Sequence, residues 1–210
     1  MALTGAERCL LRLAAALCSS RESVLRAALG DCLQAGVEAS SLRAVIHTSY
    51  LFDGYPAALE GFRILAELTG PANSGAPIRY DAATIELWRR RGEEFCRRVY
   101  GPQFERLTQR VGSIAPELAD AMLVEGYGKV LSSEELSPRL RELCVTAMLI
   151  AKGRRRQLLS HAIGALRVGA KSTELLALPQ LLDGVVEATF RTSADLLLSE
   201  AVKVVGQTSD

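Results

Sequence analysis

The sequence predicts an all-α protein of eight to ten helices, built from two pseudo-symmetric helical hairpins. Leucine and alanine dominate the 210 residues, and the alternation of β-branched residues that is typical of strands is scarce. Glycines stand where two of the expected helices would end, at Gly36 and Gly169. In addition, residues 8–42 align without a gap with residues 141–175, which indicates an internal duplication.

The duplicated segment sets the expected domain organisation. Leucines and one glycine recur in register across three expected helical segments, at one constant offset. Residues 1–68 would form the first helical repeat. Residues 69–84, rich in glycine, proline and alanine, would form a loop or linker. Residues 85–210 would then form the second repeat.

Serine residues mark three expected helix starts. Ser19 and Glu22 have the spacing of a capping box, and Ser137 stands before a proline at the first helical position. Ser172 precedes a further helical run. Helices are therefore expected to begin just after these three serines.

Composition and charge argue against several classes of protein. Lysine plus arginine (25) nearly balances aspartate plus glutamate (24), so the basic surplus of a nucleic-acid binder is missing. No run approaches the roughly 18 consecutive apolar residues that a membrane helix needs. The five cysteines are scattered without a Cys-x-x-Cys pair, which argues against a disulfide framework or a zinc site. We therefore expect a cytoplasmic protein without a nucleic-acid or membrane partner.

A polar stripe in the second repeat is the main candidate for chemistry. Arg154, Gln157 and His161 are separated by three and four residues, so they share one face of a helix. Glu142 lies in the preceding helix, and an antiparallel hairpin would bring it to His161. A carboxylate beside an imidazole orients the ring and favours its protonated form, which gives an acid/base pair near neutral pH. Arg154 would hold a substrate carboxylate through a bidentate contact.

The first repeat lacks this stripe. Its residues at the aligned positions are Cys9 for Glu142, Val24 for Gln157 and Ala28 for His161. A generic solvated face would be expected in both copies, so the difference favours a special role. The alternative is a single histidine that is satisfied in the core or on the surface. A metal site is disfavoured because a third convergent ligand is missing.

A second histidine lies in the first repeat. The spacing of His47, Tyr50 and Gly54 predicts a histidine and a tyrosine on one side of a helix that ends at Asp53-Gly54. His47 is accordingly a candidate substrate contact. The alternative is an aromatic-rich helix end that packs on its neighbour.

Three segments resemble the carboxymuconolactone decarboxylase-like proteins, which include the alkylhydroperoxidase D group. Residues 125–175 are similar to the central helical hairpin of that family, its most specific part. Residues 91–107 resemble the segment that leads into it, and residues 45–65 resemble the helix that follows it, with its Gly-x-Pro-Ala-Ala ending. The resemblance implies an alkylhydroperoxidase D-like fold that assembles as homotrimers or hexamers.

The resemblance also implies roles for the stripe. In the peroxidase branch the hairpin carries a glutamate, a Cys-x-x-Cys pair and a histidine. Glu142 and His161 match the glutamate and the histidine, whereas Arg154 and Gln157 stand where the two cysteines would be. Without that dithiol, thiol peroxidase activity is not expected.

What remains is the decarboxylase-like pattern, which implies cofactor-free decarboxylation or isomerisation of a small carboxylate or lactone. His161 would be the general acid/base and Glu142 its orienting partner. Arg154 and Gln157 would contact the carboxylate and the lactone.

Two other classes of function stay open. One is a non-catalytic helical protein, either an oligomeric scaffold or a small-molecule-binding protein. The other is a peroxidase that uses Cys96 or Cys144, although both cysteines are expected to be small core residues. A catalytic site requires Glu142 and His161 to be in contact and to line a closed apolar pocket, whereas a scaffold would leave His161 exposed or packed without a cavity.

Overall fold

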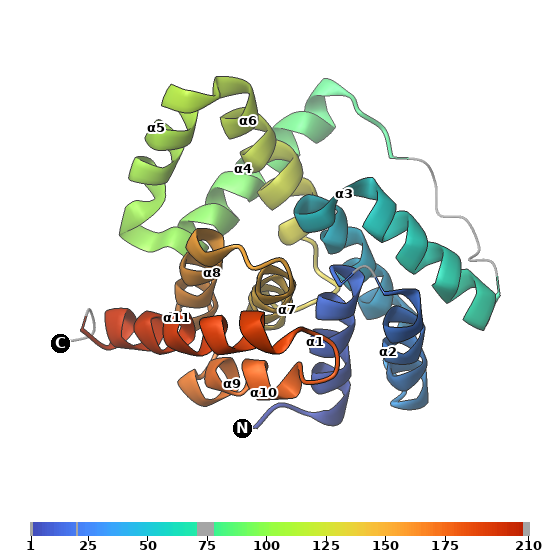
Figure 1. Ribbon diagram of the computed structural model, residues 1–210. Coiled ribbons are helices and arrows are strands. Elements are labelled where there is room, and N and C mark those ends of the chain that lie inside the picture. Colours follow the sequence, from blue (N-terminus) through green and yellow to red (C-terminus); the bar gives the residue numbers. More distant parts are fainter. Residues whose placement is uncertain (1, 20, 71–77, 208–210) are drawn as a thin grey trace. The chain divides into compact units, whose positions relative to one another are not determined.

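The computed structural model describes residues 2–19, 21–70 and 78–207, and within these ranges it contains helices and no β-strand (Figure 1). The all-α prediction is therefore confirmed. The described residues form eleven α-helices and two further helical segments, more than the eight to ten expected. The surplus comes from short pieces of four to six residues: α6 (Pro116–Ala121), α9 (Ser172–Leu176) and α10 (Leu178–Leu181).

Contacts between residues divide the chain into two compact units. The first joins residues 1–72 to residues 135–210, and the second is formed by residues 73–134. The domain boundaries expected from the repeat, at residues 68 and 85, stay predictions. The linker expected at 69–84 falls partly on residues 71–77, which lie outside the described residues.

Helix α7 (Pro138–Ala151) lies at the centre of the first unit, where it contacts α1 (Gly5–Leu17), α3 (Ala39–Thr69), α8 (Arg155–Arg167) and α11 (Ala188–Gln207). Every residue from Leu140 to Ile150 is buried. A helix that is buried on all sides is the core of its unit, and the other helices pack around it.

The two helical hairpins of this unit have matching boundaries. Helix α2 (Glu22–Gln34) and helix α8 (Arg155–Arg167) both have 13 residues, and their ends coincide in the alignment of the two repeats. Gly36 and Gly169, just beyond these helices, both adopt positive φ angles, as expected for glycines at helix C-termini. The internal duplication itself stays a prediction, since equal helix lengths do not establish common descent.

The expected helix starts are partly correct. Ser137 caps α7, because its side chain accepts a hydrogen bond from the Leu140 amide. The capping box expected at Ser19 and Glu22 is wrong, because Ser19 Oγ donates to the Ala16 carbonyl and Arg21 is the residue before α2. In this turn the serine closes the end of α1 instead of opening α2.

Ser172 is the first residue of α9 and not its cap. Lys171 precedes the helix, and its amide donates to Glu174 Oε2 at 3.0 Å. A carboxylate three residues into the helix therefore accepts from the backbone amide of the residue before it, which is the glutamate half of a capping box.

Helix α3 (Ala39–Thr69) contains a sharp kink at Asp53 and Gly54. The helix was expected to end there, but it resumes directly with Pro56 in its second half. Gly54 has a φ of 78°, a left-handed conformation that favours glycine. An ion pair of 2.6 Å between Asp53 Oδ1 and Lys152 Nζ joins this kink to the end of α7.

The second unit is built on α4 (Ala82–Tyr100) and η2 (Met122–Leu131), a segment of π-helix. A short 3₁₀ turn, η1 (Gly101–Gln103), and α5 (Phe104–Ile114) follow α4 and lead through α6 to η2. Helix α4 and η2 touch through their backbones. A Cβ atom on Gly92 would lie 1.9 Å from the Leu123 carbonyl oxygen, and one on Gly128 would lie 1.9 Å from the Trp88 carbonyl oxygen.

This backbone contact predicts that Gly128→Ala destabilises the second unit. The added methyl group meets a carbonyl that cannot rotate away, so we expect a loss of about 3 kcal/mol in the free energy of unfolding. Trp88, the single tryptophan of the sequence, lies in α4 and reports this unit through its fluorescence during urea unfolding.

Gly126→Ala is the matched control, because a Cβ atom at Gly126 meets nothing within 4 Å. Its unfolding midpoint should equal or slightly exceed that of the wild type, since alanine favours helix over glycine. Equal midpoints for the two variants would contradict the backbone contact.

Candidate functional site

The α7–α8 hairpin brings Glu142 and His161 into direct contact. Glu142 lies on α7 and His161 lies in the middle of α8, and the Gly153 turn between the helices reverses the chain. Glu142 Oε2 lies 2.8 Å from His161 Nδ1. The contact that a site requires is therefore present, while the catalytic roles of the two residues stay predictions.

Both side chains of this pair are buried. Glu142 is 0% exposed and His161 is 7% exposed. A carboxylate removed from water needs a hydrogen-bonded partner, and the imidazole at Oε2 supplies one. The other carboxylate oxygen, Oε1, has no hydrogen-bond partner among the described residues. This oxygen is therefore a buried acceptor whose hydrogen-bonding capacity is not used by the described residues.

Phe52 adds an aromatic wall to the pair. Its ring meets the imidazole of His161 edge to face, with centroids 6.0 Å apart and an interplanar angle of 82°. Phe52 is the residue just before the kink of α3. Phe52 was not among the site residues predicted from the sequence. The available indication was its place directly before Asp53-Gly54, where the helix changes direction.

A buried arginine next to Glu142 was also missed. Arg141 is 1% exposed, and its Nη1 donates to Thr48 Oγ1 of α3 at 3.2 Å. Its Nη2 lies 3.8 Å from Glu135 Oε2. Burial lowers the pKa of Arg141 from its usual value, since the charged guanidinium is removed from water. The sequence contained one indication that Arg141 is buried, because the helix around it is apolar on nearly every face.

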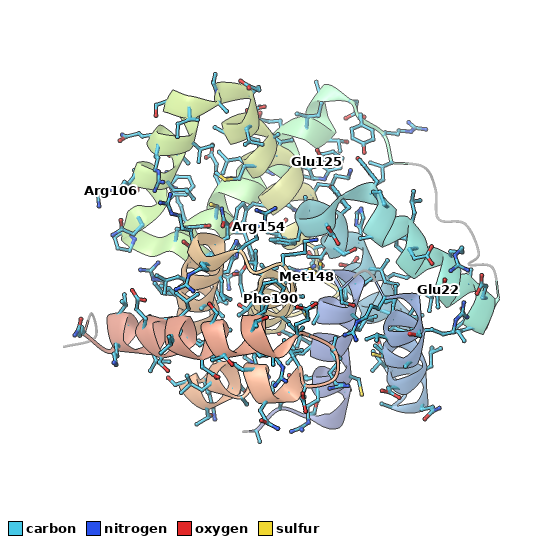
Figure 2. All side chains as sticks on the ribbon, in the orientation of Figure 1. Glu22, Arg106, Glu125, Met148, Arg154 and Phe190 are labelled. Atoms are coloured by element: carbon cyan, nitrogen blue, oxygen red, sulfur yellow. The ribbon has the colours of Figure 1, made fainter. Side chains whose placement is uncertain are left out.

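Arg154 lies just before α8 (Figure 2), Gln157 lies in the first turn of that helix, and both are exposed. Arg154 is the N-cap residue, and Gln157 stands one turn before His161 on the same helix. The structure therefore places Gln157 and His161 on one helix with Arg154 just before it, and it leaves Arg154 and Gln157 at the surface. Their contact with a substrate stays a prediction.

His47 belongs to a row of aromatic rings on α3. Its ring lies 5.2 Å from that of Tyr50 at a tilt of 43°, and Tyr50 stacks on Tyr55 at the same centroid distance. The expected placement of His47 and Tyr50 on one side of a helix is confirmed. This arrangement agrees with the packing alternative, and a role of His47 in substrate binding is untested.

The cysteines lie mostly in the interior of the protein. All five are free thiols, and all except the half-buried Cys9 are buried. Burial raises the pKa of Cys18, Cys32 and Cys144 to about 12. A thiolate is the reactive form, so these thiols are poor nucleophiles at neutral pH. Cys96 and Cys144 are buried core residues, as expected.

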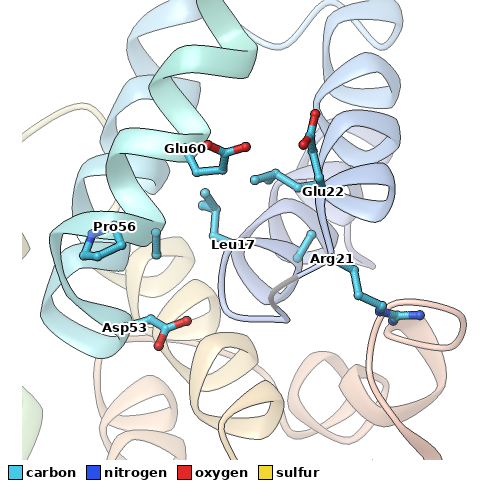
Figure 3. Close-up of a pocket in the computed structure, with 9 residues that line it drawn as sticks. Leu17, Arg21, Glu22, Asp53, Pro56 and Glu60 are labelled. Atoms are coloured by element: carbon cyan, nitrogen blue, oxygen red, sulfur yellow. The ribbon is translucent and has the colours of Figure 1, made fainter.

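A cavity of about 480 Å³ lies apart from this pair, between α1, α2 and the kink of α3 (Figure 3). Its walls include Leu17, Pro56, Asp53 and Glu60, and none of the five predicted site residues lines it. Asp53 and Glu60 are already paired, with Lys152 and Arg63 respectively. The cavity thus offers no unpaired charge from these two carboxylates.

Within the described residues, no group of three or more histidine, cysteine, aspartate or glutamate side chains is placed to hold a metal ion. None of the helices in the described ranges has the length and apolar character needed to cross a membrane.

Comparison with known proteins confirms the resemblance in the second half of the chain. The model of the carboxymuconolactone decarboxylase family matches residues 116–183, which include Glu142, Arg154, Gln157 and His161. The segments at 45–65 and 91–107 lie outside this match. A curated relative, Peroxisomal protein 2 of Schizosaccharomyces pombe, is 28% identical over 137 residues. The match covers 65% of this chain and 64% of the relative, so the chain spans less than two thirds of that protein.

The burial of the pair predicts a specific pattern of stability. His161→Leu leaves the Glu142 carboxylate buried without its partner, so we expect it to lower the free energy of unfolding by about 3 kcal/mol. Adding Glu142→Leu to that variant should recover part of the loss, because a pair of apolar residues needs no partner. Urea unfolding of the single and double variants measures this; a double variant less stable than His161→Leu would contradict it.

The thiol environments predict that native alkylation is confined to Cys9. At about pH 8 a thiol with a pKa near 12 is thiolate only at the level of about 10⁻⁴. Iodoacetamide followed by peptide mass spectrometry should therefore label Cys9 first and leave Cys18, Cys32 and Cys144 unmodified. Denaturation in urea should expose all five. Fast, selective oxidation of Cys96 or Cys144 by hydrogen peroxide would instead support the peroxidase class.

Proposed function

We propose, from the match of residues 116–183 to the carboxymuconolactone decarboxylase family, that the protein is a cofactor-independent acid/base catalyst for a small carboxylate or lactone. The observation that carries the proposal is the buried contact of 2.8 Å between Glu142 and His161. A histidine held by a carboxylate is the usual arrangement for moving protons near neutral pH.

The roles follow from the geometry of the pair. The Nδ1–H group of His161 would donate to Glu142 Oε2, and this contact holds the imidazole ring in one orientation. The other ring nitrogen, Nε2, is then the one that would exchange a proton with the substrate. In a decarboxylation, the carbon–carbon bond between the substrate and its carboxylate breaks and carbon dioxide leaves. The electron pair of that bond stays on the substrate, which becomes a dienolate. Protonated His161 then delivers a proton to carbon. In an isomerisation, His161 removes a proton from one carbon and returns it to another.

Arg154 and Gln157 would contact the substrate at the N-terminal end of α8. The guanidinium of Arg154 is exposed, so it is available for a bidentate contact with a carboxylate. Gln157 shares a helix face with His161 and would donate to a lactone oxygen. His47 is a further proposed contact from α3. Proximity of these groups to the pair would orient the reacting carbon toward Nε2.

The alternative is a non-catalytic oligomeric scaffold or small-molecule-binding protein. The exposure of Arg154 and Gln157 favours it, because these side chains make no buried site with His161 in the described chain. Assembly as a homotrimer or hexamer is proposed under both alternatives.

We propose the cytoplasm as the compartment, in keeping with the free thiols. The name of the yeast relative offers the peroxisome as the competing location.

The catalytic proposal predicts the fate of His161→Asn. Wild-type protein is mixed with carboxymuconolactone, and released carbon dioxide is measured together with the change in ultraviolet absorption of the lactone. We expect His161→Asn to lose at least about 100-fold in rate and Glu142→Gln to lose about 10-fold, as is usual for an acid/base group and its orienting partner.

Ser160→Ala is the matched control on α8, because Ser160 Oγ only donates to the Arg156 carbonyl of its own helix. Its rate should equal that of the wild type, and circular dichroism checks that all variants are folded. If the wild-type protein releases no carbon dioxide and forms no isomer, the catalytic proposal is contradicted and the non-catalytic alternative is supported.

A further inference from the structure

A second cavity lies at the beginning of α1, away from Glu142 and His161. Its volume is about 570 Å³, which is within the range of small-molecule sites. It is formed between α1 and the end of α10, and its walls include Leu3, Arg8, Cys9, Arg12, Ala177 and Leu181. The function proposed above uses none of these residues.

The charge of this cavity is positive. Arg8 and Arg12 line it, and no aspartate or glutamate is among its lining residues. Two nearby carboxylates are engaged elsewhere. Glu7 is bound to Arg139 and the Thr4 amide, and Asp183 Oδ1 pairs with Arg191 at 2.7 Å. The cavity therefore presents two cations to whatever enters it.

The positions of Arg8 and Arg12 on α1 are electrostatically unfavourable when no anion is bound. They are separated by four residues on α1, so their like charges repel across one helical turn. Arg8 also lies near the N-terminus of this helix of 13 residues, where the helix dipole disfavours a cation. An anion bound between Arg8 and Arg12 would remove both penalties.

The donors of the arginines are available to such an anion. Both hydrogen bonds that the Arg12 side chain makes with described residues come from Nη1, which donates to the Leu181 carbonyl at 2.7 Å and the Asp183 carbonyl at 3.0 Å. These bonds fix the guanidinium at the cavity wall and leave its Nε and Nη2 donors. Arg8 is exposed, and its side chain makes no hydrogen bond or ion pair with any residue that the structure describes.

The remaining wall selects an organic anion over an inorganic one. Leu3, Ala177 and Leu181 add apolar surface to the lining that contains the two arginines. An apolar body such as an aromatic ring would be removed from water there, while its carboxylate faces the arginines. Cys9, which is half-buried, stands between Arg8 and Arg12 in sequence and lines the same space.

We propose that this cavity binds a small organic carboxylate, held by Arg8 and Arg12, with its apolar part over Leu3, Ala177 and Leu181 and within reach of the Cys9 thiol. The site is independent of the Glu142–His161 pair, and its test does not use catalytic activity. Cys9 serves as the reporter, because it is the half-buried cysteine and the other four are buried.

The first test compares a charged and a neutral disulfide as thiol reagents. Dithiobis(nitrobenzoate) carries two aromatic carboxylates, whereas dithiodipyridine is uncharged. In both reactions the Cys9 thiolate attacks one reagent sulfur, a protein–reagent disulfide forms, and an aryl thiolate leaves. Arg8→Gln should lower the rate of Cys9 with the charged reagent by about fivefold or more and change the rate with the neutral reagent by less than about twofold.

Arg106→Gln is the matched control, since it removes the same charge from an exposed position on α5 (Figure 2). It should leave both rates as in the wild type. Peptide mapping assigns the modified cysteine, and urea unfolding checks that Arg8→Gln is as stable as the wild type.

The second test uses benzoate as the ligand. Benzoate should slow the alkylation of Cys9 by neutral iodoacetamide in the wild type and in Arg106→Gln, and the effect should be lost in Arg8→Gln. An absence of protection in the wild type would overturn the proposal. Equal protection in Arg8→Gln would also overturn it, because benzoate would then act without the arginine.

Discussion

Helix α7 is buried on every side, and this constraint determines how its neighbours are placed. A buried helix can carry polar side chains only if other groups satisfy them, since water cannot. Arg141, Glu142 and Thr146 are the polar residues in its buried stretch. Thr146 Oγ1 donates to the Glu142 carbonyl of its own helix, so it needs no neighbour. The two charged residues reach outward, one to α3 and the other to α8.

These two contacts hold different helices to α7. Consecutive residues point about 100° apart around a helix, so Arg141 and Glu142 serve different sides. Arg141 bonds Thr48 on α3, while Glu142 bonds His161 on α8. Phe52, one turn beyond Thr48 on α3, then meets the ring of His161. The orientation of the histidine is thus determined by three helices and not by its own helix alone.

The sequence predicted the parts of this arrangement that depend on local spacing. A short turn between two regular helices is enough to bring Glu142 to His161, so periodicity alone leads to that contact. Arg141 was missed because charged residues are almost never fully buried, and the burial of this one depends on Thr48, 93 positions away. The Ser19 cap failed for a related reason. Its hydroxyl had a nearer partner at the end of α1, and spacing rules do not rank competing partners.

The order of the units along the chain has a consequence for synthesis on the ribosome. Helix α1 packs against α7, yet residues 73–134, which form a compact unit of their own, are made between them. More than half of the chain must therefore be synthesised after α1 before α7 is available to pack against the buried leucines of α1. Translation adds about 5–20 residues per second, so this interval lasts for several seconds. During that time α1 can pack only against α2 and α3, so the part of its apolar surface that α7 later covers stays in contact with water.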